Sequence, residues 1–149
     1  MRMAMGLAAA FALAGGAHAG EALPVGLFAI TARLELPHLE RWAVDKTRAV
    51  CLDGAGGLPI PVLNTGTGLA HCAAAEVQRG AAGLSYAIVC PGRDATRATA
   101  RYRVEPDRFQ GRVAIVMGAK NMTMTEVQVG RRLGACAPGG PLRRISGPG

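Results

Sequence analysis

Hydrophobic and polar residues alternate along this chain in several short segments, and the clearest begins near residue 26. Between positions 26 and 36, the larger apolar residues that share one side of an extended chain are Phe28, Ile30, Leu34 and Leu36. Alternation with a period of two predicts a half-buried β-strand. The strand should end before Pro37, because proline has no N–H group to donate to a neighbouring strand.

Segments of the same kind follow, each bounded by residues that favour turns. We predict further strands at 41–52, of which 47–52 is the better part, and at 71–79, 84–90, 95–105, 108–117 and 122–133. Short strands between turns predict an all-β fold, an antiparallel meander of about seven strands that forms a curved sheet or small barrel. The expected core residues are Phe28, Ile30, Leu34, Ile88, Tyr102, Val104, Val113 and Ile115.

The segment 53–70 is rich in Gly, Pro, Asn and Thr. That composition predicts a loop, because these residues favour turns over strands. The segment is long for a loop in a compact domain, and loops of this length are often functional or mobile.

The register of one hairpin follows from its sequence. If residues 106–107 form a two-residue loop, Val104 lies opposite Phe109, and the apolar or small residues of both strands share one face. A slip by one residue would mix apolar and polar side chains on each face, so this register is favoured. The other face then carries Arg101 directly opposite Arg112.

The outer face of this hairpin is therefore basic. We call its four arginines, Arg97, Arg101, Arg103 and Arg112, the arginine face. Like charges directly opposite one another on neighbouring strands cost stability, which indicates a role in binding phosphate or carboxylate groups. An ordinary solvated face is nevertheless the favoured interpretation of this cluster.

The N-terminal residues have the three parts of a secretory signal peptide. Arg2 is followed by an uncharged apolar run over 4–16 and by the small-x-small site Ala17-His18-Ala19. We expect cleavage after Ala19, export across the inner membrane and a periplasmic location. The apolar run is shorter than the about 20 residues that span a bilayer, and we expect no transmembrane segment in the mature chain.

These features predict three parts: a signal peptide at 1–19, a single β domain at 20–136 and a disordered tail at 137–149. Removal of the signal peptide takes one arginine with it and lowers the formal net charge from +7 to +6. A basic protein of this kind can bind anionic surfaces, or the charge can serve only solubility.

The four cysteines predict two disulfides, because an even number in a small exported domain is typical of disulfide-bonded proteins. A symmetric three-residue loop at 80–82 places Cys72 opposite Cys90, and directly opposed residues of neighbouring strands are near disulfide range. Cys51 is then left to pair with Cys136.

The sequence contains no motif that indicates catalysis. His38 and His71 lie outside any nucleophile motif, and the glycines of the long loop lack the lysine of a phosphate-binding loop. Met117, Met122 and Met124 cluster around one turn, where thioethers could bind Cu(I), although packing in the core is the ordinary interpretation. We predict no enzyme activity, no metal site and no cofactor. Few aromatic residues are present for stacking on bases, so we expect no nucleic-acid partner.

Several segments resemble a family of small exported proteins, the domain-of-unknown-function family numbered three-six-one-seven. They are LPVGLFAIT at 23–31, AVCL at 49–52, LSYAIVC at 84–90 with the preceding Cys72, YRVEPDRFQGRVAIVM at 102–117, MTM at 122–124 and GRRLGAC at 130–136. The chain departs from the family pattern at Phe28 and Tyr86, where tryptophan is usual. The resemblance implies an exported β domain and transfers no activity or functional residue.

Two functions of different classes are consistent with the sequence, and the first is the one we predict, with the second as the alternative. The first is a non-catalytic binding module whose curved sheet holds a small apolar or amphipathic ligand in a pocket lined by Phe28 and Tyr102. The second is an accessory protein that docks on a larger envelope complex or an anionic surface through the arginine face. The first expects an interior pocket, and the second expects a filled interior and an exposed basic patch.

Overall fold

A computed structural model describes residues 23–54, 57–81, 83–92, 96–118 and 122–138, which form one antiparallel β-sheet. The predicted signal peptide at 1–19 lies outside the described residues, as does 139–149 of the predicted tail.

The regular elements of the described residues are seven strands and three short 3-10 turns. In chain order they are β1 (Gly26–Glu35), η1 (Glu40–Trp42), β2 (Asp45–Leu52), η2 (Thr65–Thr67), η3 (Leu69–His71), β3 (Ala73–Gly80), β4 (Gly83–Val89), β5 (Arg97–Val104), β6 (Arg108–Met117) and β7 (Met122–Gly134). The predicted all-β meander is therefore confirmed.

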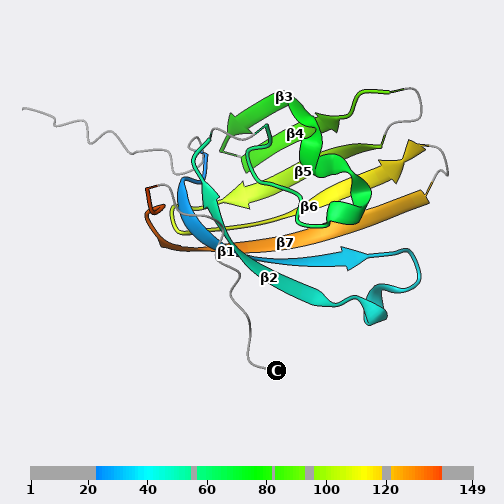
Figure 1. Ribbon diagram of the computed structural model, residues 1–149, viewed down its shortest axis with the longest axis horizontal. Helices are drawn as coiled ribbons and strands as arrows, with labels where there is room; N and C mark the ends of the chain where they lie inside the picture. The colour runs from blue at the N-terminus through cyan, green and yellow to red at the C-terminus, as the bar shows by residue number, and fades with distance from the viewer. Residues whose placement is uncertain (1–22, 55–56, 82, 93–95, 119–121, 139–149) are drawn as a thin grey trace, which may run out of the picture.

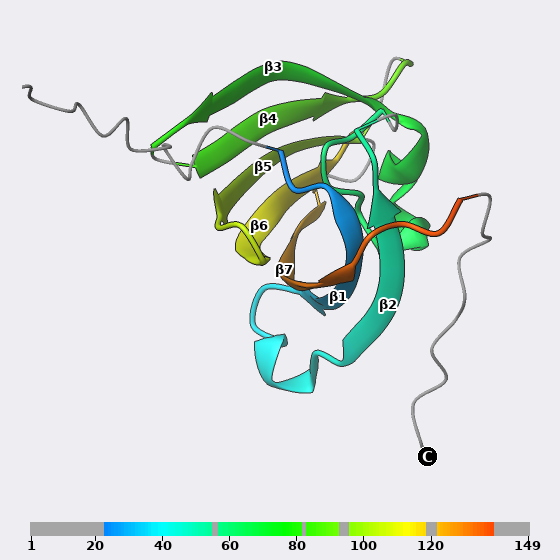
Figure 2. The ribbon, with the colours of Figure 1, turned by 90° about the vertical axis from the view of Figure 1, so that its left-hand side faces the viewer.

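The strands are ordered β2-β1-β7-β6-β5-β4-β3 across the sheet, so β1 lies between β2 and the last strand of the meander. All neighbouring strands are antiparallel. The sheet is curved, and β2 and β3 form its two edges (Figures 1 and 2). Of the two predicted forms, the structure has the curved sheet and not the closed barrel.

The alternation of the sequence becomes an alternation of burial. In β5 every second residue is buried and the residues between are exposed, as a strand with one face on a core requires. Seven of the eight expected core residues are buried, and the eighth, Leu34, is half-buried and packs against them.

Two strand boundaries differ from the prediction. Residues 41–44 do not extend β2, because a 3-10 turn occupies Glu40–Trp42 before the strand begins. His71 belongs to η3, so β3 begins at Ala73.

The long loop fills the concave side of the sheet. Its side chains Leu58, Ile60, Val62 and Leu69 are buried and belong to the same hydrophobic cluster as Phe28. Figure 2 shows this segment lying between the two edge strands, β2 and β3. The loop prediction for 53–70 is correct for the backbone, but the segment also completes the core.

Both predicted disulfides are present, Cys72–Cys90 and Cys51–Cys136. The second joins edge strand β2 to the chain that follows β7. The predicted loop of the β3–β4 hairpin is wrong, because Gly80 pairs with Gly83 and leaves a two-residue connection.

A β-bulge explains why the first disulfide nevertheless forms as predicted. The register shifts by one residue between Ala75 and Gln78, where Glu76 has a φ of 53°. A bulge inserts one extra residue into one strand. It compensates for the shorter loop, so that Ala73 pairs with Val89 and brings the neighbouring cysteines together.

Candidate functional site

The arginine face lies on the outer side of β5 and β6, as the hairpin register predicts. Arg101 pairs with Arg112 and Arg103 pairs with Gln110. All four arginines of the arginine face are exposed, whereas Tyr102 between two of them is buried. The structure therefore brings the predicted residues together on one surface.

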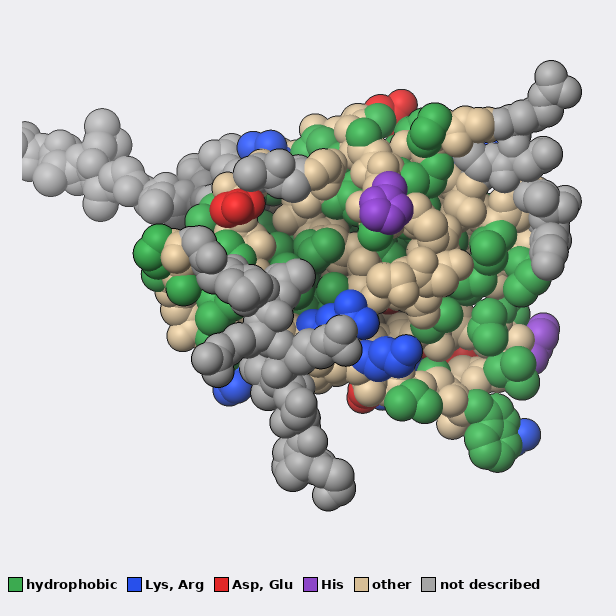
Figure 3. Space-filling view, viewed as in Figure 1, with side chains coloured by type: hydrophobic (Ala, Val, Ile, Leu, Met, Phe, Trp, Pro, Cys, Tyr) green, Lys and Arg blue, Asp and Glu red, His purple; other side chains and the backbone are tan. Residues whose placement is uncertain are grey.

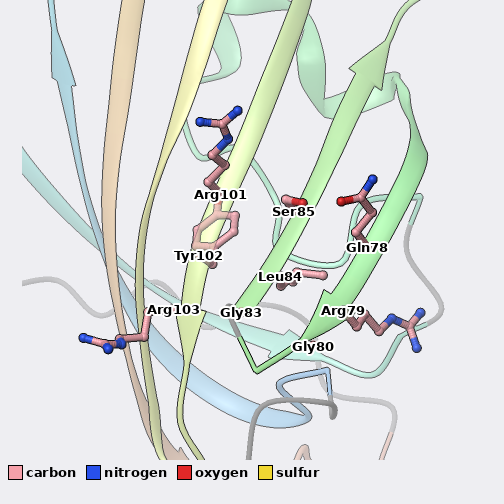
Figure 4. A pocket seen from close by; sticks show the side chains of 9 residues that line it. All are labelled: Gln78, Arg79, Gly80, Gly83, Leu84, Ser85, Arg101, Tyr102 and Arg103. Carbon is pink, nitrogen blue, oxygen red and sulfur yellow. The ribbon is translucent and has the colours of Figure 1, made fainter.

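A row of hydrogen-bond donors crosses four strands at the centre of this face. The row runs from Gln78 on β3 through Ser85 on β4 and Arg101 on β5 to Arg112 on β6, each paired with the next. Figure 4 shows the first three side chains in line across their strands, with Arg103 pointing away from them. A shallow hollow of about 490 Å³ lies over this part of the sheet.

These side chains can all donate hydrogen bonds to an oxyanion. Arginine binds phosphate or carboxylate oxygens with a planar fork of N–H groups, and the amide of Gln78 and the hydroxyl of Ser85 add neutral donors. Opposed residues of neighbouring strands have Cβ atoms about 5 Å apart, so Arg101 and Arg112 can hold one anion between them. Gln78 and Ser85 could not be placed in this row from the sequence, because the predicted three-residue loop gives the β3–β4 hairpin a different register at Gln78 and because no register was predicted between β4 and β5.

The basic surface continues onto β7 through Arg131. This residue pairs with Arg108 of β6 and with Ala29 of β1, whose side chains share the outer face. Arg131 is exposed. Its position could not be predicted from the sequence, because the register of the β5–β6 hairpin does not relate β7 to β6.

The arginines of this region differ in whether they have an acidic partner. Arg108 forms an ion pair with Glu105, and Arg33 forms one with Asp45. No arginine of the arginine face makes an ion pair or a side-chain hydrogen bond within the described part of the chain. Their charges are screened only by solvent ions, over a Debye length of about 8 Å at physiological salt.

The interior contains a second polar cluster, which was not predicted from the sequence. Glu126 and Gln128 are 1% and 0% exposed and lie on the inner face of β7. The two carboxylate oxygens of Glu126 accept hydrogen bonds from the backbone N–H groups of Leu63 and Asn64, at 2.8 and 2.9 Å. The side-chain amide of Gln128 donates to the carbonyl of Pro61 at 2.9 Å and also to Glu126.

Two tyrosines extend this cluster. The hydroxyl of Tyr86 donates to the carbonyl of Ile60 at 2.8 Å, and that of Tyr102 donates to the side-chain oxygen of Gln128 at 3.0 Å. We call Tyr86, Tyr102, Glu126 and Gln128 the polar clamp, because together they hold the backbone of residues 60–64. Every buried side-chain polar atom in the described residues has a hydrogen-bond partner. The polar clamp therefore fixes the loop that fills the sheet.

Burial perturbs the acidity of both tyrosines. It raises the pKa of Tyr86 to about 12, although hydrogen bonds to Tyr102 and Ile60 partly oppose the effect. Burial also raises the pKa of Tyr102 well above its ordinary value of 10.0, and the nearby Tyr86 adds to the rise. Both phenols thus stay protonated, and able to donate, well above neutral pH.

The tyrosine pKa values predict how stability depends on alkaline pH. An unfolded tyrosine loses its proton near pH 10, whereas folded Tyr86 keeps it until about pH 12. The unfolded state therefore binds fewer protons above pH 10, and the free energy of unfolding should fall between pH 10 and 12. Tyrosinate absorbance near 295 nm should rise only toward pH 12 in the folded protein, and near pH 10 in guanidinium.

The signal in this titration comes from the polar clamp alone, since the chain has only two tyrosines. Tyrosinate absorbance appearing near pH 10 in the folded protein would show that at least one of the two phenols is accessible to solvent.

The other residues considered from the sequence lie away from these clusters. His38 and His71 are exposed, the first beyond the end of β1 and the second in η3. Met117 pairs with Met122, but only Met124 of the three methionines is buried in the core. No group of three His, Cys, Asp or Glu side chains in the described residues is placed to hold a metal ion.

Comparisons with known proteins found no matching family model, curated protein or solved structure. The resemblance to the domain-of-unknown-function family stays a prediction. No helical segment in the described residues is long and apolar enough to cross a membrane.

Proposed function

We propose that this protein is an exported, non-catalytic docking protein that binds an anionic component of the cell envelope through the arginine face. The observation that carries the proposal is the direct opposition of Arg101 and Arg112 without an acidic partner in the described residues. Such a pair costs stability in the free protein. An anion placed between the two guanidinium groups would remove that repulsion.

The filled interior supports surface binding over binding inside the sheet. Phe28 and Tyr102, which would line an interior pocket, instead pack on either side of Phe109, with ring centroids 5.5 and 5.7 Å from it. The alternative function, binding of a small apolar ligand on the inner face, would require residues 57–71 to leave the core. That movement would break the hydrogen bonds of the polar clamp and expose four apolar side chains.

The disulfides support an oxidising location. Disulfides persist outside the cytoplasm and are rare in reducing compartments. All four cysteines of the chain are paired, which fits an extracytoplasmic protein. The more specific assignment to the periplasm rests on the signal-peptide pattern of residues 1–19.

The proposal predicts that changing Arg101→Gln and Arg112→Gln together weakens binding to envelope fragments from the native cell. Each arginine near an anionic surface contributes about 1 kcal/mol, so the double variant should bind about 30-fold more weakly. Its free energy of unfolding should change by less than about 0.5 kcal/mol, because these side chains are exposed. Co-sedimentation over a series of salt concentrations measures the first effect, and denaturant unfolding measures the second.

A matched pair of single variants controls for the loss of net charge. Arg112→Gln and Arg48→Gln each remove one exposed charge, but Arg48 pairs with Ile30 and lies on the other side of the sheet. Only Arg112→Gln should weaken binding. Equal binding by the wild type and the double variant at every salt concentration would show that the arginine face is only a solvated surface without a role in binding.

A further inference from the structure

The connection between β1 and β2 presents apolar side chains to solvent. Leu39, Trp42 and Val44 are 50%, 70% and 71% exposed. We call these three residues the apolar tip. Scattered exposed apolar residues are common, but three large ones within a six-residue segment form a concentrated patch, and such patches mark interaction sites.

The backbone of the apolar tip is ordered by its own hydrogen bonds. The N–H of Leu39 donates to Leu36 O at 3.0 Å, Trp42 N–H to Leu39 O at 2.9 Å, and Ala43 N–H to Glu40 O at 3.1 Å. The first bond closes the turn at residues 36–39, and the other two form the 3-10 turn η1, in which no residue is buried. The fold therefore holds the indole outward, so little conformational entropy is lost when a partner covers it.

Basic side chains lie beside the apolar tip. The guanidinium carbon of Arg41 is 5.3 Å from the centre of the Trp42 ring, and Lys46 follows at the start of β2. Of the acids near the tip, Glu40 accepts a hydrogen bond from the backbone N–H of His38, and Asp45, which follows Val44, forms an ion pair with Arg33. Figure 3 shows an apolar projection with a basic side chain next to it at the corner where η1 lies.

The apolar tip and the arginine face are close along the sheet. Arg33 and Asp45 are the last paired residues of β1 and β2 before the tip. Arg33 also lies in one cross-strand row with Val127, Arg112 and Arg101. Neighbouring strands are about 4.8 Å apart, so Arg112 lies about 10 Å from Arg33 across the sheet. A single extended surface can contact both features.

We propose that this surface is a lipid bilayer with anionic headgroups, into whose interface the apolar tip inserts while the arginine face contacts headgroup phosphates. The inference rests on the proposed function and names its anionic component. Tryptophan favours the boundary between headgroups and acyl chains, and basic residues are attracted to anionic lipids. The arginines are spread over several strands instead of converging on one pocket, which matches a field of phosphates better than one bound anion.

The chain contains a single tryptophan, so intrinsic fluorescence reports the apolar tip directly. The mature protein is mixed with vesicles of phosphatidylcholine alone or with phosphatidylglycerol added. With phosphatidylglycerol, Trp42 emission should shift to shorter wavelength and acrylamide quenching should fall. High salt and the Arg101→Gln/Arg112→Gln double variant should each reduce the shift.

Variants separate insertion from electrostatic attachment. Val44→Ser keeps the fluorophore, and it should weaken vesicle binding about tenfold because an exposed tip side chain no longer enters the interface. Val25→Ser is the matched control, since Val25 is 59% exposed and precedes β1 at the opposite end from the tip. Its binding should equal that of the wild type.

Three other results of these experiments would each overturn the inference in a different way. Vesicle binding without a change in Trp42 emission would refute insertion while leaving docking through the arginine face intact. Arginine-dependent binding to native envelope fragments, with no binding to protein-free vesicles, would assign the anionic component to a protein or glycan. Failure to bind either material would remove the proposed function together with the inference.

Discussion

Replacing Glu126 with alanine is expected to lower the free energy of unfolding by about 4 kcal/mol. The carboxylate accepts hydrogen bonds from the backbone N–H groups of Leu63 and Asn64 in a site that is 1% exposed. Each buried donor left without an acceptor costs about 1–3 kcal/mol, and the lost side-chain volume adds to this. Equilibrium unfolding in denaturant with the disulfides intact measures the change.

Glu126→Gln tests whether the two acceptor oxygens are the cause. Glutamine keeps the volume but replaces one oxygen with an NH₂ group, which would face a backbone donor. A loss of about 2 kcal/mol is expected, since one donor then lacks an acceptor. Hydrogen exchange should also become faster at the amides of Leu63 and Asn64, whose protection depends on this carboxylate.

Glu35→Gln is the matched control for the loss of a carboxylate. Glu35 ends β1 and pairs with Thr125 of β7, close to Glu126 in the sheet, but it is partly exposed. Its replacement should change stability by less than about 0.5 kcal/mol. Equal losses in Glu35→Gln and Glu126→Gln would mean that the polar clamp does not hold the loop.

The polar clamp also explains why the buried face of β7 could not be predicted from the sequence. In β7 the apolar pattern alone would turn Val127 and Val129 toward the core, but the buried residues are Glu126 and Gln128, and Val129 is 53% exposed. The inversion has a physical cause. The inner face of β7 meets the backbone of a loop, whose N–H and C=O groups need partners once they are buried.

The loop could not be placed from composition for a related reason. Gly and Pro correctly predict irregular backbone over 53–70, but the same segment contributes Leu58, Ile60, Val62 and Leu69 to the core. Its apolar residues show no sustained strand or helix period, because irregular backbone imposes none. Whether such a loop covers its own sheet depends on tertiary contacts that periodicity does not encode.

The register of a hairpin could be predicted from the sequence where the apolar pattern of both of its strands was clear. The β5–β6 register was predictable because a slip by one residue would mix apolar and polar side chains on each face, and it placed Arg101 opposite Arg112 correctly. The β3–β4 hairpin was predicted with the correct disulfide and the wrong loop, since the bulge near Glu76 shifts the register within β3. Apolar patterning is weak there, because β3 is an edge strand with no fully buried residue.

Gly130→Ala is expected to lower the free energy of unfolding by about 3 kcal/mol. Gly130 pairs with Phe109 across β7 and β6, and the phenyl ring covers the glycine. A methyl group at this position would lie 2.2 Å from two carbons of the ring, well inside van der Waals contact. Phe109 is 1% exposed and packs against the rings of Phe28 and Tyr102, so it cannot move without disturbing both. Overpacking of this kind costs about 1–3 kcal/mol, and the close contact with a confined ring places the effect at the upper end.

Gly80→Ala is the matched control, because an added methyl group at Gly80 in β3 would meet no atom within 4 Å. That variant should be as stable as the wild type or slightly more stable, since alanine reduces the conformational freedom of the unfolded chain. Thermal and denaturant unfolding of the two variants compare the same chemical change at a covered and an open site. Recovery of stability in Gly130→Ala/Phe109→Leu, relative to Phe109→Leu alone, would assign the cost to the ring. Similar losses at both glycines would instead show that backbone conformation, and not the Phe109 contact, requires glycine in these strands.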